Sequence, residues 1–378
     1  MPASRATPSL DETDLVSSLR LIRSRRVGPA TFHRLIGEYG SARRALDALP
    51  DVARAAGDAD YRPCSQETAE REIAAGYRAG ARLIHQGAPD YPVDLARITD
   101  APPLLWMKGR MALASRPAVA LVGARNASSL GTRTARLLAS DLGRDGLIIV
   151  SGLARGVDTA AHLAALQTGT VAVLAGGIDQ IYPRENVKLA EDIVATGMLI
   201  SERPPGLYPQ ARDFPRRNRL ISGLAQAVIV VEAAARSGSL ITARDALDQG
   251  RDVMAVPGHP LDARAAGCNM LIRDGAVLVR GSRDVLAALS ARSAPELGTS
   301  APGHEVAVPA DTKPRASIPE ALEISRRILS LLGPSPVPED QVIRELELPA
   351  QAVSTQLVAL ELDGKLERQR GGMLSRVV

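Results

Sequence analysis

The stretch V-S-G-L-A-R-G-V-D-T-A-A-H, from Val150 to His162, contains an apolar segment, a glycine-rich turn and the start of a helix. Glycines in such a turn let the backbone approach a ligand closely. Asp158 and His162 are four residues apart, so a helix places them on one face. The pattern predicts one strand–turn–helix unit of an α/β sheet. We therefore expect the function to depend on this loop and on similar loops around it.

Short apolar segments that alternate with helical spacing lie on both sides of this unit. Continuous apolar strands of this kind are typical of a parallel sheet that is buried on both faces, which predicts a doubly wound α/β fold. In this fold class, ligands bind at the carboxyl ends of the strands. The predicted strands are residues 118–122, 147–150, 171–175, 198–200, 227–231, 253–256 and 276–279.

The residues that follow these strands share a composition of glycine and serine, with Arg125 after the first strand. Helix-start amides and hydroxyls suit anionic oxygens, and an arginine can bind a phosphate through two hydrogen bonds. Any single tight turn also favours glycine, so one loop alone has an ordinary structural explanation. Repetition at several strand ends predicts an anion site. Its candidate residues are Gly123, Arg125, Ser151, Gly152, Arg155, Gly156, Gly176, Gly177, Ser237, Gly238 and Ser239.

These loops lack the motifs of the common nucleotide sites. No G-x-G-x-x-G follows the first predicted strand, no acidic residue ends the second, and no G-x-x-x-x-G-K-[ST] occurs. The sequence therefore supports neither an NAD site nor ATP hydrolysis, and we expect no cofactor.

An arginine cluster lies in A-R-D-F-P-R-R-N-R-L-I-S-G-L, residues 211–224. Four arginines against the single Asp213 cannot be neutralised locally, so the cluster faces either water or phosphates. A solvated helix face is one explanation, but Asn218 and Phe214 favour nucleic acid. Residues 101–290 contain 22 basic and 16 acidic residues, a net charge of +6 against +4 for the whole chain.

The flanking segments indicate further domains, which a chain of 378 residues allows. Residues 10–80 have helical spacing, and their turn Val27-Gly28-Pro29 resembles half of a helix-hairpin-helix or an ordinary helix–helix turn. Residues 291–318 are rich in Ala, Pro, Ser and Gly, which predicts a flexible linker. Three helical patterns and a hairpin with Gly371-Gly372 at its tip then predict a winged helix. Its third helix, residues 349–364, contains no lysine or arginine, which favours a protein-contact or structural role over duplex recognition.

The composition, with 45% hydrophobic and 23% charged residues, is that of a globular protein. No apolar run approaches the ~20 residues of a membrane span, and the N-terminal residues show no signal-peptide core. Cys64 and Cys268 provide neither a disulfide framework nor a metal cluster. We expect a cytoplasmic protein without membrane association or a bound metal.

Taken together, the motifs resemble the DNA-processing protein A family (DprA, also called Smf). The matching stretches are V-G-A-R at 122–125, S-G-L-A-R-G-V-D-T-A-A-H at 151–162, L-A-G-G-I-D-Q-I-Y-P at 174–183, F-P-R-R-N-R-L-I-S-G-L at 214–224, V-V-E-A-A-A-R-S-G-S-L-I-T-A at 230–243 and V-P-G at 256–258. The resemblance implies a SAM-like helical domain over 1–83, a Rossmann-like DNA-binding domain over 84–290 and a winged-helix domain over 319–378. It also implies a dimer that binds and protects single-stranded DNA in natural transformation and recombination and helps load RecA, without catalysis.

The resemblance also implies which residues hold phosphates. These are Arg125 together with the nearby cluster of Arg216, Arg217, Asn218 and Arg219. The chain departs from the family at Ala124, where a hydroxyl is common, and at Val157, where isoleucine is. Aromatic residues are only 2% of the chain, with Phe214, Tyr182 and Tyr208 near the motifs, so we expect phosphate contacts to dominate and affinity to fall steeply with salt.

Three alternatives remain open in the sequence. Asp158 and His162 are suited to a metal pair or an acid–base couple, although helix-start capping by Asp158 and a bond from His162 to a strand end are structural roles for them. The related phosphoribohydrolases cleave AMP-type nucleotides with a P-G-G-x-G-T-x-x-E motif, where this chain has E-A-A-A-R-S-G-S-L-I-T-A, without the glycine pair and the trailing glutamate. A double-stranded DNA regulator acting through the winged helix is the third possibility.

Overall fold

The computed structural model describes residues 12–55, 60–293, 318–332, 337–346, 348, 353, 357, 360, 366–369 and 373–376. The chain divides into two compact units, Met1–Leu297 and Gly298–Val378. Most of the linker predicted over 291–318 lies outside the described residues. None of the helices described in either unit is both long and apolar enough to cross a membrane.

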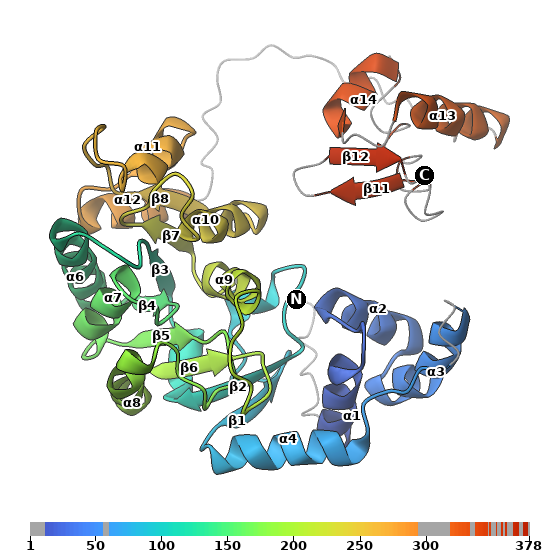
Figure 1. Ribbon diagram of the computed structural model, residues 1–378, viewed down its shortest axis with the longest axis horizontal. Helices are drawn as coiled ribbons and strands as arrows, with labels where there is room; N and C mark the ends of the chain where they lie inside the picture. Colours follow the sequence, from blue (N-terminus) through green and yellow to red (C-terminus); the bar gives the residue numbers. More distant parts are fainter. Residues whose placement is uncertain are drawn as a thin grey trace, which may run out of the picture. The chain divides into compact units, whose positions relative to one another are not determined.

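Within the described residues of the first unit, nine strands form one sheet in the order β1-β2-β6-β5-β4-β3-β7-β8-β9 (Figure 1). Every pairing from β6 to β9 is parallel, whereas β1 and β2 are antiparallel additions at one edge. The strands are β1 (Arg82–His85), β2 (Leu104–Gly109), β3 (Ala118–Val122), β4 (Ile148–Ser151), β5 (Thr170–Val173), β6 (Met198–Ser201), β7 (Ala227–Val230), β8 (Asp252–Ala255) and β9 (Val277–Leu278). The prediction of a doubly wound, mostly parallel sheet is confirmed, and β1 and β2 were not predicted.

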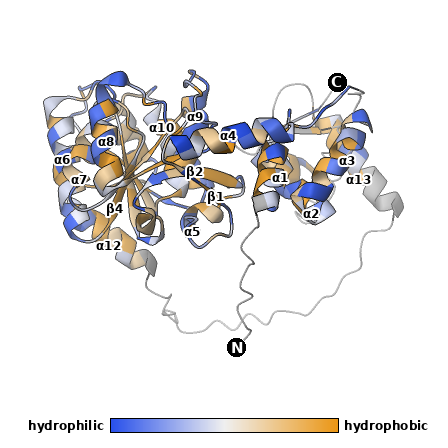
Figure 2. Ribbon diagram, turned by 90° about the horizontal axis from the view of Figure 1, so that it is seen from below, coloured by the Kyte–Doolittle hydropathy of each residue, from blue (hydrophilic) through white to orange (hydrophobic). Residues whose placement is uncertain are grey.

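Helices cover both faces of this sheet because alternate strand residues point to opposite sides. In β3, Ala118, Ala120 and Val122 belong to one apolar core, and Val119 and Leu121 belong to the other. Figure 2 shows the apolar strands enclosed by helices with polar outer surfaces. The face that contains Val119 carries α6 (Ser129–Arg144), α7 (Val157–Ala165), α8 (Val187–Thr196) and α12 (Ser282–Ser293). The face that contains Val122 carries α5 (Val93–Ala96), α9 (Asp213–Gly223), α10 (Ser239–Asp248) and α11 (Ala266–Arg273).

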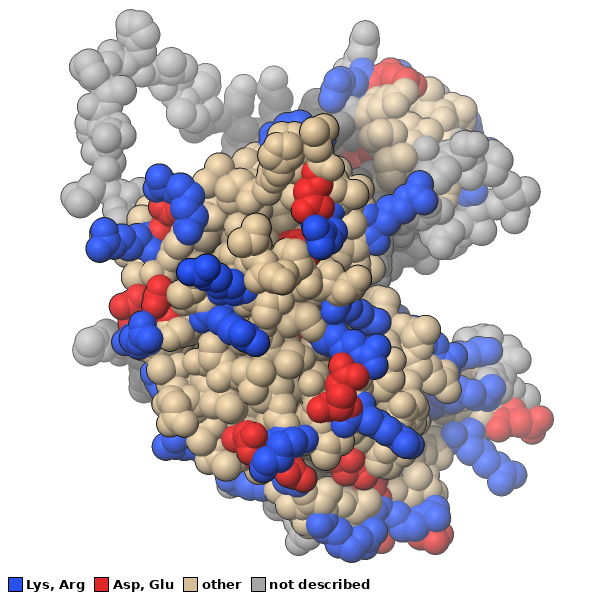
Figure 3. Space-filling view, turned by 60° about the vertical axis from the view of Figure 1, so that its left-hand side comes forward, with Lys and Arg blue, Asp and Glu red and all other residues tan. Residues whose placement is uncertain are grey.

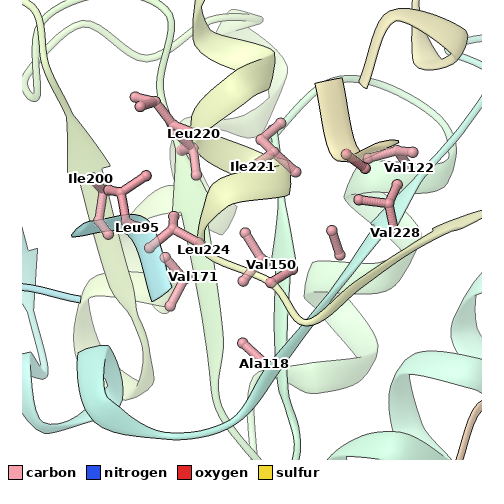
Figure 4. Packing of buried hydrophobic residues seen from close by; sticks show 14 of the residues in the cluster. Leu95, Ala118, Val122, Val150, Val171, Ile200, Leu220, Ile221, Leu224 and Val228 are labelled. Carbon is pink, nitrogen blue, oxygen red and sulfur yellow. The ribbon is translucent and has the colours of Figure 1, made fainter. Parts of the chain in front are cut away.

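Helix α9 is held on the second face by its apolar stripe. Leu220, Ile221 and Leu224 point from α9 toward the sheet residues Val150 and Val171 (Figure 4). The strand order reverses between β3 and β7, so the helices on the two sides diverge at this position. Such a switch point leaves a crevice at the carboxyl ends of the strands.

The N-terminal helices pack against the antiparallel edge of the same unit. They are α1 (Glu12–Arg23), α2 (Pro29–Tyr39), α3 (Ala42–Ala55) and α4 (Gln66–Arg78). Trp106 of β2 is fully buried against α4, where its Nε1 donates a 3.1 Å hydrogen bond to Glu72. Arg23 of α1 binds the same carboxylate and also donates to the carbonyl oxygen of Glu202 at the end of β6.

The second unit has the winged-helix arrangement, and this prediction is confirmed. Its described elements are α13 (Ile318–Leu331), β10 (Val337–Pro338), α14 (Glu339–Leu346), β11 (Leu366–Gln369) and β12 (Met373–Arg376), with the strands ordered β10-β12-β11. Of the predicted third helix, Val353, Leu357 and Leu360 are described, and all three are helical and buried. The predicted hairpin tip at Gly371-Gly372 lies outside the described residues.

Candidate nucleic-acid interface

A cleft of about 990 Å³ opens at the carboxyl ends of β3, β4, β7 and β8, at the switch point of the sheet. We call it the strand-end cleft. Among the described residues that line it, four are arginines and one is an acid, so its wall carries a positive charge. These residues are Arg125, Arg217, Arg236, Arg264 and Asp158. On the face drawn in Figure 3, Lys and Arg side chains are spread over the surface, with Asp and Glu side chains beside only some of them.

Arg125 is exposed at the rim of the cleft, on the loop between β3 and α6. This loop packs directly on the loop between β4 and α7, where the Val157 amide donates to the carbonyl oxygen of Ala124. Gly156 has a positive φ of 72°, and a Cβ there would overlap the Ala124 carbonyl oxygen, so glycine is required. The two glycine loops therefore support each other and hold Arg125 in place.

Three aromatic side chains from separate segments gather beside Arg125. The Tyr182 ring centroid lies 5.5 Å from that of Phe214 and 6.1 Å from that of Tyr208, and both pairs are edge-to-face. The guanidinium of Arg125 lies over the Phe214 ring, 5.1 Å from its centroid. Tyr182 and Tyr208 are 39% and 50% exposed, so their rings are available to a stacked base. Exposed aromatic rings beside arginines are the combination that binds single-stranded nucleic acid without sequence preference.

Gly176 and Gly177, both predicted site residues, contribute to this cluster indirectly. They pack against the segment 204–209 that carries Tyr208, and the amide of Gly177 donates a 2.8 Å hydrogen bond to the Leu207 carbonyl oxygen. A side chain at either position would collide with that segment. The glycines therefore position Tyr208.

Arg217 also lines the cleft, but its side chain is buried, with only 6% of the residue exposed. Its Nη1 donates to the carbonyl oxygens of Gly152 (2.8 Å) and Val173. Burial lowers its pKa to about 10, so it stays charged at neutral pH. Asp158 accepts hydrogen bonds from the amides of Gly152 and Ala154, and burial raises its pKa while Arg217 acts in the opposite direction.

His162 is fully buried below this loop. Its Nδ1 lies 2.7 Å from the Thr170 hydroxyl, which itself donates to the carbonyl oxygen of Ile149, so Nδ1 carries the proton and donates. Burial, with a smaller contribution from the charge of Arg217, lowers the pKa of His162 to about 3. This geometry agrees with the contact to a strand residue that the sequence allows for His162. No group of metal-ligating side chains occurs among the described residues.

The remaining predicted residues divide between the cleft and its surroundings. Ser237, Gly238, Ser239 and Asn218 line the cleft, and Arg216 is exposed on α9. Arg219 turns away, where it binds the carboxylates of Glu202 and Asp100. Ser151 is fully buried, and its hydroxyl donates to the carbonyl oxygen of Leu121. Arg155 is exposed and forms a two-point ion pair with Glu185.

Two cleft arginines were missed by the sequence prediction. Arg236 precedes Ser237 in the loop after β7, and Arg264 lies in the loop after β8, where it pairs with Asp262. Arg236 directly precedes the predicted Ser237 and was passed over in favour of the serines and the glycine, whereas Arg264 lies six residues beyond Gly258, where the inspected segment ended.

A carboxylate occupies the first turn of α6, where a dinucleotide fold would bind phosphate. Glu232, which is 8% exposed, accepts hydrogen bonds from the amide and the hydroxyl of Ser128 at the helix start. A Cβ at Gly131 would overlap this carboxylate, so the acid lies against the first helical turn. The negative charge of Glu232 complements the helix dipole and repels a phosphate from this position.

Comparison with known proteins gives matches along the chain. Residues 82–290 match the family model described as DNA recombination-mediator protein A, residues 12–75 match the DprA-like N-terminal HHH domain, and residues 312–372 match the DprA winged helix domain. The DNA processing protein DprA of Streptococcus pneumoniae is 49% identical over 199 residues, which cover 52% of this chain and 70% of that protein. Protein Smf of Escherichia coli is 40% identical over 299 residues, which cover 77% of this chain and 76% of that protein.

Two solved structures are similar to this one. The DprA structure from Streptococcus pneumoniae aligns with a TM-score of 0.58 at 36% identity, covering 70% of this chain and 98% of that one. The structure of DNA processing protein A from Helicobacter pylori, which is described as giving insight into a single-stranded DNA binding mode, aligns with a TM-score of 0.52 at 28% identity. It covers 57% of this chain and 98% of the other.

Proposed function

Because this chain belongs to the DNA-processing protein A (DprA/Smf) family, we propose that it binds single-stranded DNA in natural transformation and homologous recombination, through the strand-end cleft. The observation that carries this proposal is the exposed Arg125 over Phe214, with Tyr182 and Tyr208 beside it. Phosphates bind the cleft arginines and bases stack on the rings. The Helicobacter pylori relative is described as binding single-stranded DNA.

Fluorescence anisotropy of labelled single- and double-stranded oligonucleotides across a salt series tests this proposal. We expect selective single-strand binding that weakens steeply with salt. The Arg125→Ala, Arg236→Ala double variant should bind more weakly, and its log–log salt slope should fall by about 1.4, or about 0.7 for each lost phosphate contact. Arg54→Ala, an exposed arginine on α3, is the matched control. Equal binding of both DNA forms, or a double variant that matches wild type, would refute the proposal.

We propose a binding protein rather than an enzyme. Glu232 occupies the first turn of α6, and Asp158, the acid among the described cleft residues, already accepts two backbone amides and lies close to Arg217. These contacts disfavour a phosphoribohydrolase-like alternative, which needs a bound nucleotide phosphate and an available carboxylate. Incubation with AMP distinguishes the two functions, because release of adenine would support the enzyme.

The family further supports a cytoplasmic homodimer that protects single-stranded DNA and loads RecA onto it. β9 is an edge strand whose Val277 and Leu278 are 40% and 41% exposed, and Leu261, in the loop between β8 and α11, is 89% exposed. An exposed apolar sheet edge favours association with a second copy. Sedimentation velocity of Val277→Asp tests the dimer, which this change should dissociate.

RecA filament assembly on DNA coated by a single-strand-binding protein, with and without this chain, tests RecA loading.

A further inference from the structure

Among the arginines of α9, Arg217 is the one that is buried. Arg217 is 6% exposed, whereas the neighbouring Arg216 is exposed. Nη1 of Arg217 donates to the carbonyl oxygen of Gly152, just after β4, and to that of Val173, the last residue of β5. One guanidinium therefore fastens α9 to the ends of two strands.

The loop that Arg217 holds is also held from the other side. The amides of Gly152 and Ala154 donate 3.1 Å and 3.2 Å hydrogen bonds to the carboxylate of Asp158 on α7. A Cβ at Gly152 would lie 2.6 Å from Nη2 of Arg217, so a side chain there would push the guanidinium away. The nearby Asp158 balances the charge of Arg217 within the protein.

The contacts of Arg217 also affect the cleft, because Arg217 and Phe214 lie on the same helix. Phe214 lies one helical turn earlier, at the beginning of the same helix, and its ring lies beneath Arg125. Fixing the first turns of α9 on the ends of β4 and β5 therefore fixes the Phe214 ring relative to the phosphate-facing arginine.

We propose that Arg217 is a positioning residue for DNA binding, which acts by holding α9 and Phe214 in place, and that the phosphates meet Arg125 instead. This inference rests on the proposed function. The resemblance implies instead that Arg217 binds a phosphate. The two roles differ in their effect on the salt slope, because a side chain that binds a phosphate contributes to the slope and a positioning residue does not.

The test measures single-strand affinity against salt for Arg217→Met, Arg217→Lys and Arg125→Ala. Arg125→Ala should lower the salt slope by about 0.7. Arg217→Met should weaken binding about tenfold with an unchanged slope, a loss within the range of coupling between contacting residues. Arg217→Lys should behave like the Met variant, because an ammonium cannot reproduce a planar fork that reaches two carbonyls. Wild-type affinity in the Lys variant, or a slope drop of about 0.7 in the Met variant, would overturn the proposal.

A double-mutant cycle with Phe214→Leu distinguishes positioning from a general loss of stability. If Arg217 acts through the ring, Arg217→Met should weaken binding much less in the Phe214→Leu background; additive losses would contradict this. Gly152→Ala displaces the guanidinium without changing any charge, so it should weaken binding and leave the salt slope at its wild-type value. This variant tests the proposal if the Arg217 variants do not fold. Wild-type protein that fails to bind single-stranded DNA would instead remove the proposed function itself.

Discussion

The guanidinium carbon of Arg125 lies 5.1 Å from the centroid of the Phe214 ring. The two residues come from different elements, Arg125 from the loop after β3 and Phe214 from the first turn of α9. Phe214 is half-buried, and a cation over an aromatic ring near the surface contributes about 0.5–1 kcal/mol, so the pair keeps the arginine extended at the rim. One position therefore offers both a phosphate ligand and a stacking surface to a single nucleotide.

Replacing Phe214 by leucine should weaken single-strand binding by about 5- to 150-fold, because base stacking on an aromatic ring contributes about 1–3 kcal/mol. The salt slope should stay unchanged, since no cation is removed. Phe214→Tyr keeps the ring and should bind nearly as wild type does. Anisotropy titrations at several salt concentrations measure both quantities, and equal losses in the two variants would argue against stacking.

Arg155 and Glu185 form an exposed ion pair, with Nε–Oε1 and Nη2–Oε2 distances of 2.7 Å and 2.8 Å. Arg155 also lines a small hollow next to Arg125 and Phe214. Glu185→Gln should release Arg155 to bind a phosphate, which would tighten binding about two- to fivefold, since an exposed pair contributes at most ~1 kcal/mol. The salt slope should steepen by about 0.7. Glu191→Gln, which removes the same charge from the Lys188 pair on α8, is the control; an equal gain there would indicate a simple charge effect.

The parallel part of the sheet was predictable because strands buried on both faces form continuous apolar runs. β1 and β2 were missed for physical reasons. β1 is R-L-I-H, with only two apolar residues between polar ones, and β2 follows Ala101-Pro102-Pro103. β2 does contain the buried apolar run L-L-W-M, but it pairs antiparallel and no helix pattern of the strand–helix alternation precedes it, so the run was not assigned to the sheet.

The site was predictable to the extent that it follows strand ends. That rule found the cleft residues Gly123, Arg125 and Ser237 but did not indicate burial, so Arg217 was grouped with the exposed arginines. Helical spacing contains the missing information. Arg217 precedes Leu220, Ile221 and Leu224 by three, four and seven residues, which places it on the buried face of α9. The Arg219 pairs with Glu202 and Asp100 had no counterpart in the sequence, because they join segments far apart in the chain.

The buried His162 should make stability depend on pH. Its pKa is about 3 in the folded protein against 6.5 ordinarily, so below pH 6.5 the unfolded chain binds a proton that the folded chain does not. The free energy of unfolding should therefore fall as the pH drops from 6.5 toward 3. Asn at this position does not titrate and keeps an N–H for Thr170. Between about pH 6.5 and about pH 4.5, the free energy of unfolding should fall by about 2 kcal/mol more in wild type than in His162→Asn.

Urea unfolding over that pH range measures the difference. His259→Asn, which replaces an exposed histidine, is the control and should follow the wild-type curve. Parallel curves for wild type and His162→Asn would show that His162 is protonated in the folded protein.

Two glycines on helices of the N-terminal segment should respond to alanine in opposite directions. A Cβ on Gly76 of α4 would overlap the buried Trp106 ring, whereas a Cβ on Gly37 of α2 would meet no atom within 4 Å. Gly76→Ala should therefore cost about 1–3 kcal/mol through overpacking, and displacing the indole would also strain its bond to Glu72. Gly37→Ala should stabilise the helix by about 0.5–1 kcal/mol, because alanine loses less backbone entropy than glycine. Urea unfolding curves show whether each variant has a lower or a higher free energy of unfolding than wild type. A stabilised Gly76→Ala would mean that α4 does not pack against Trp106.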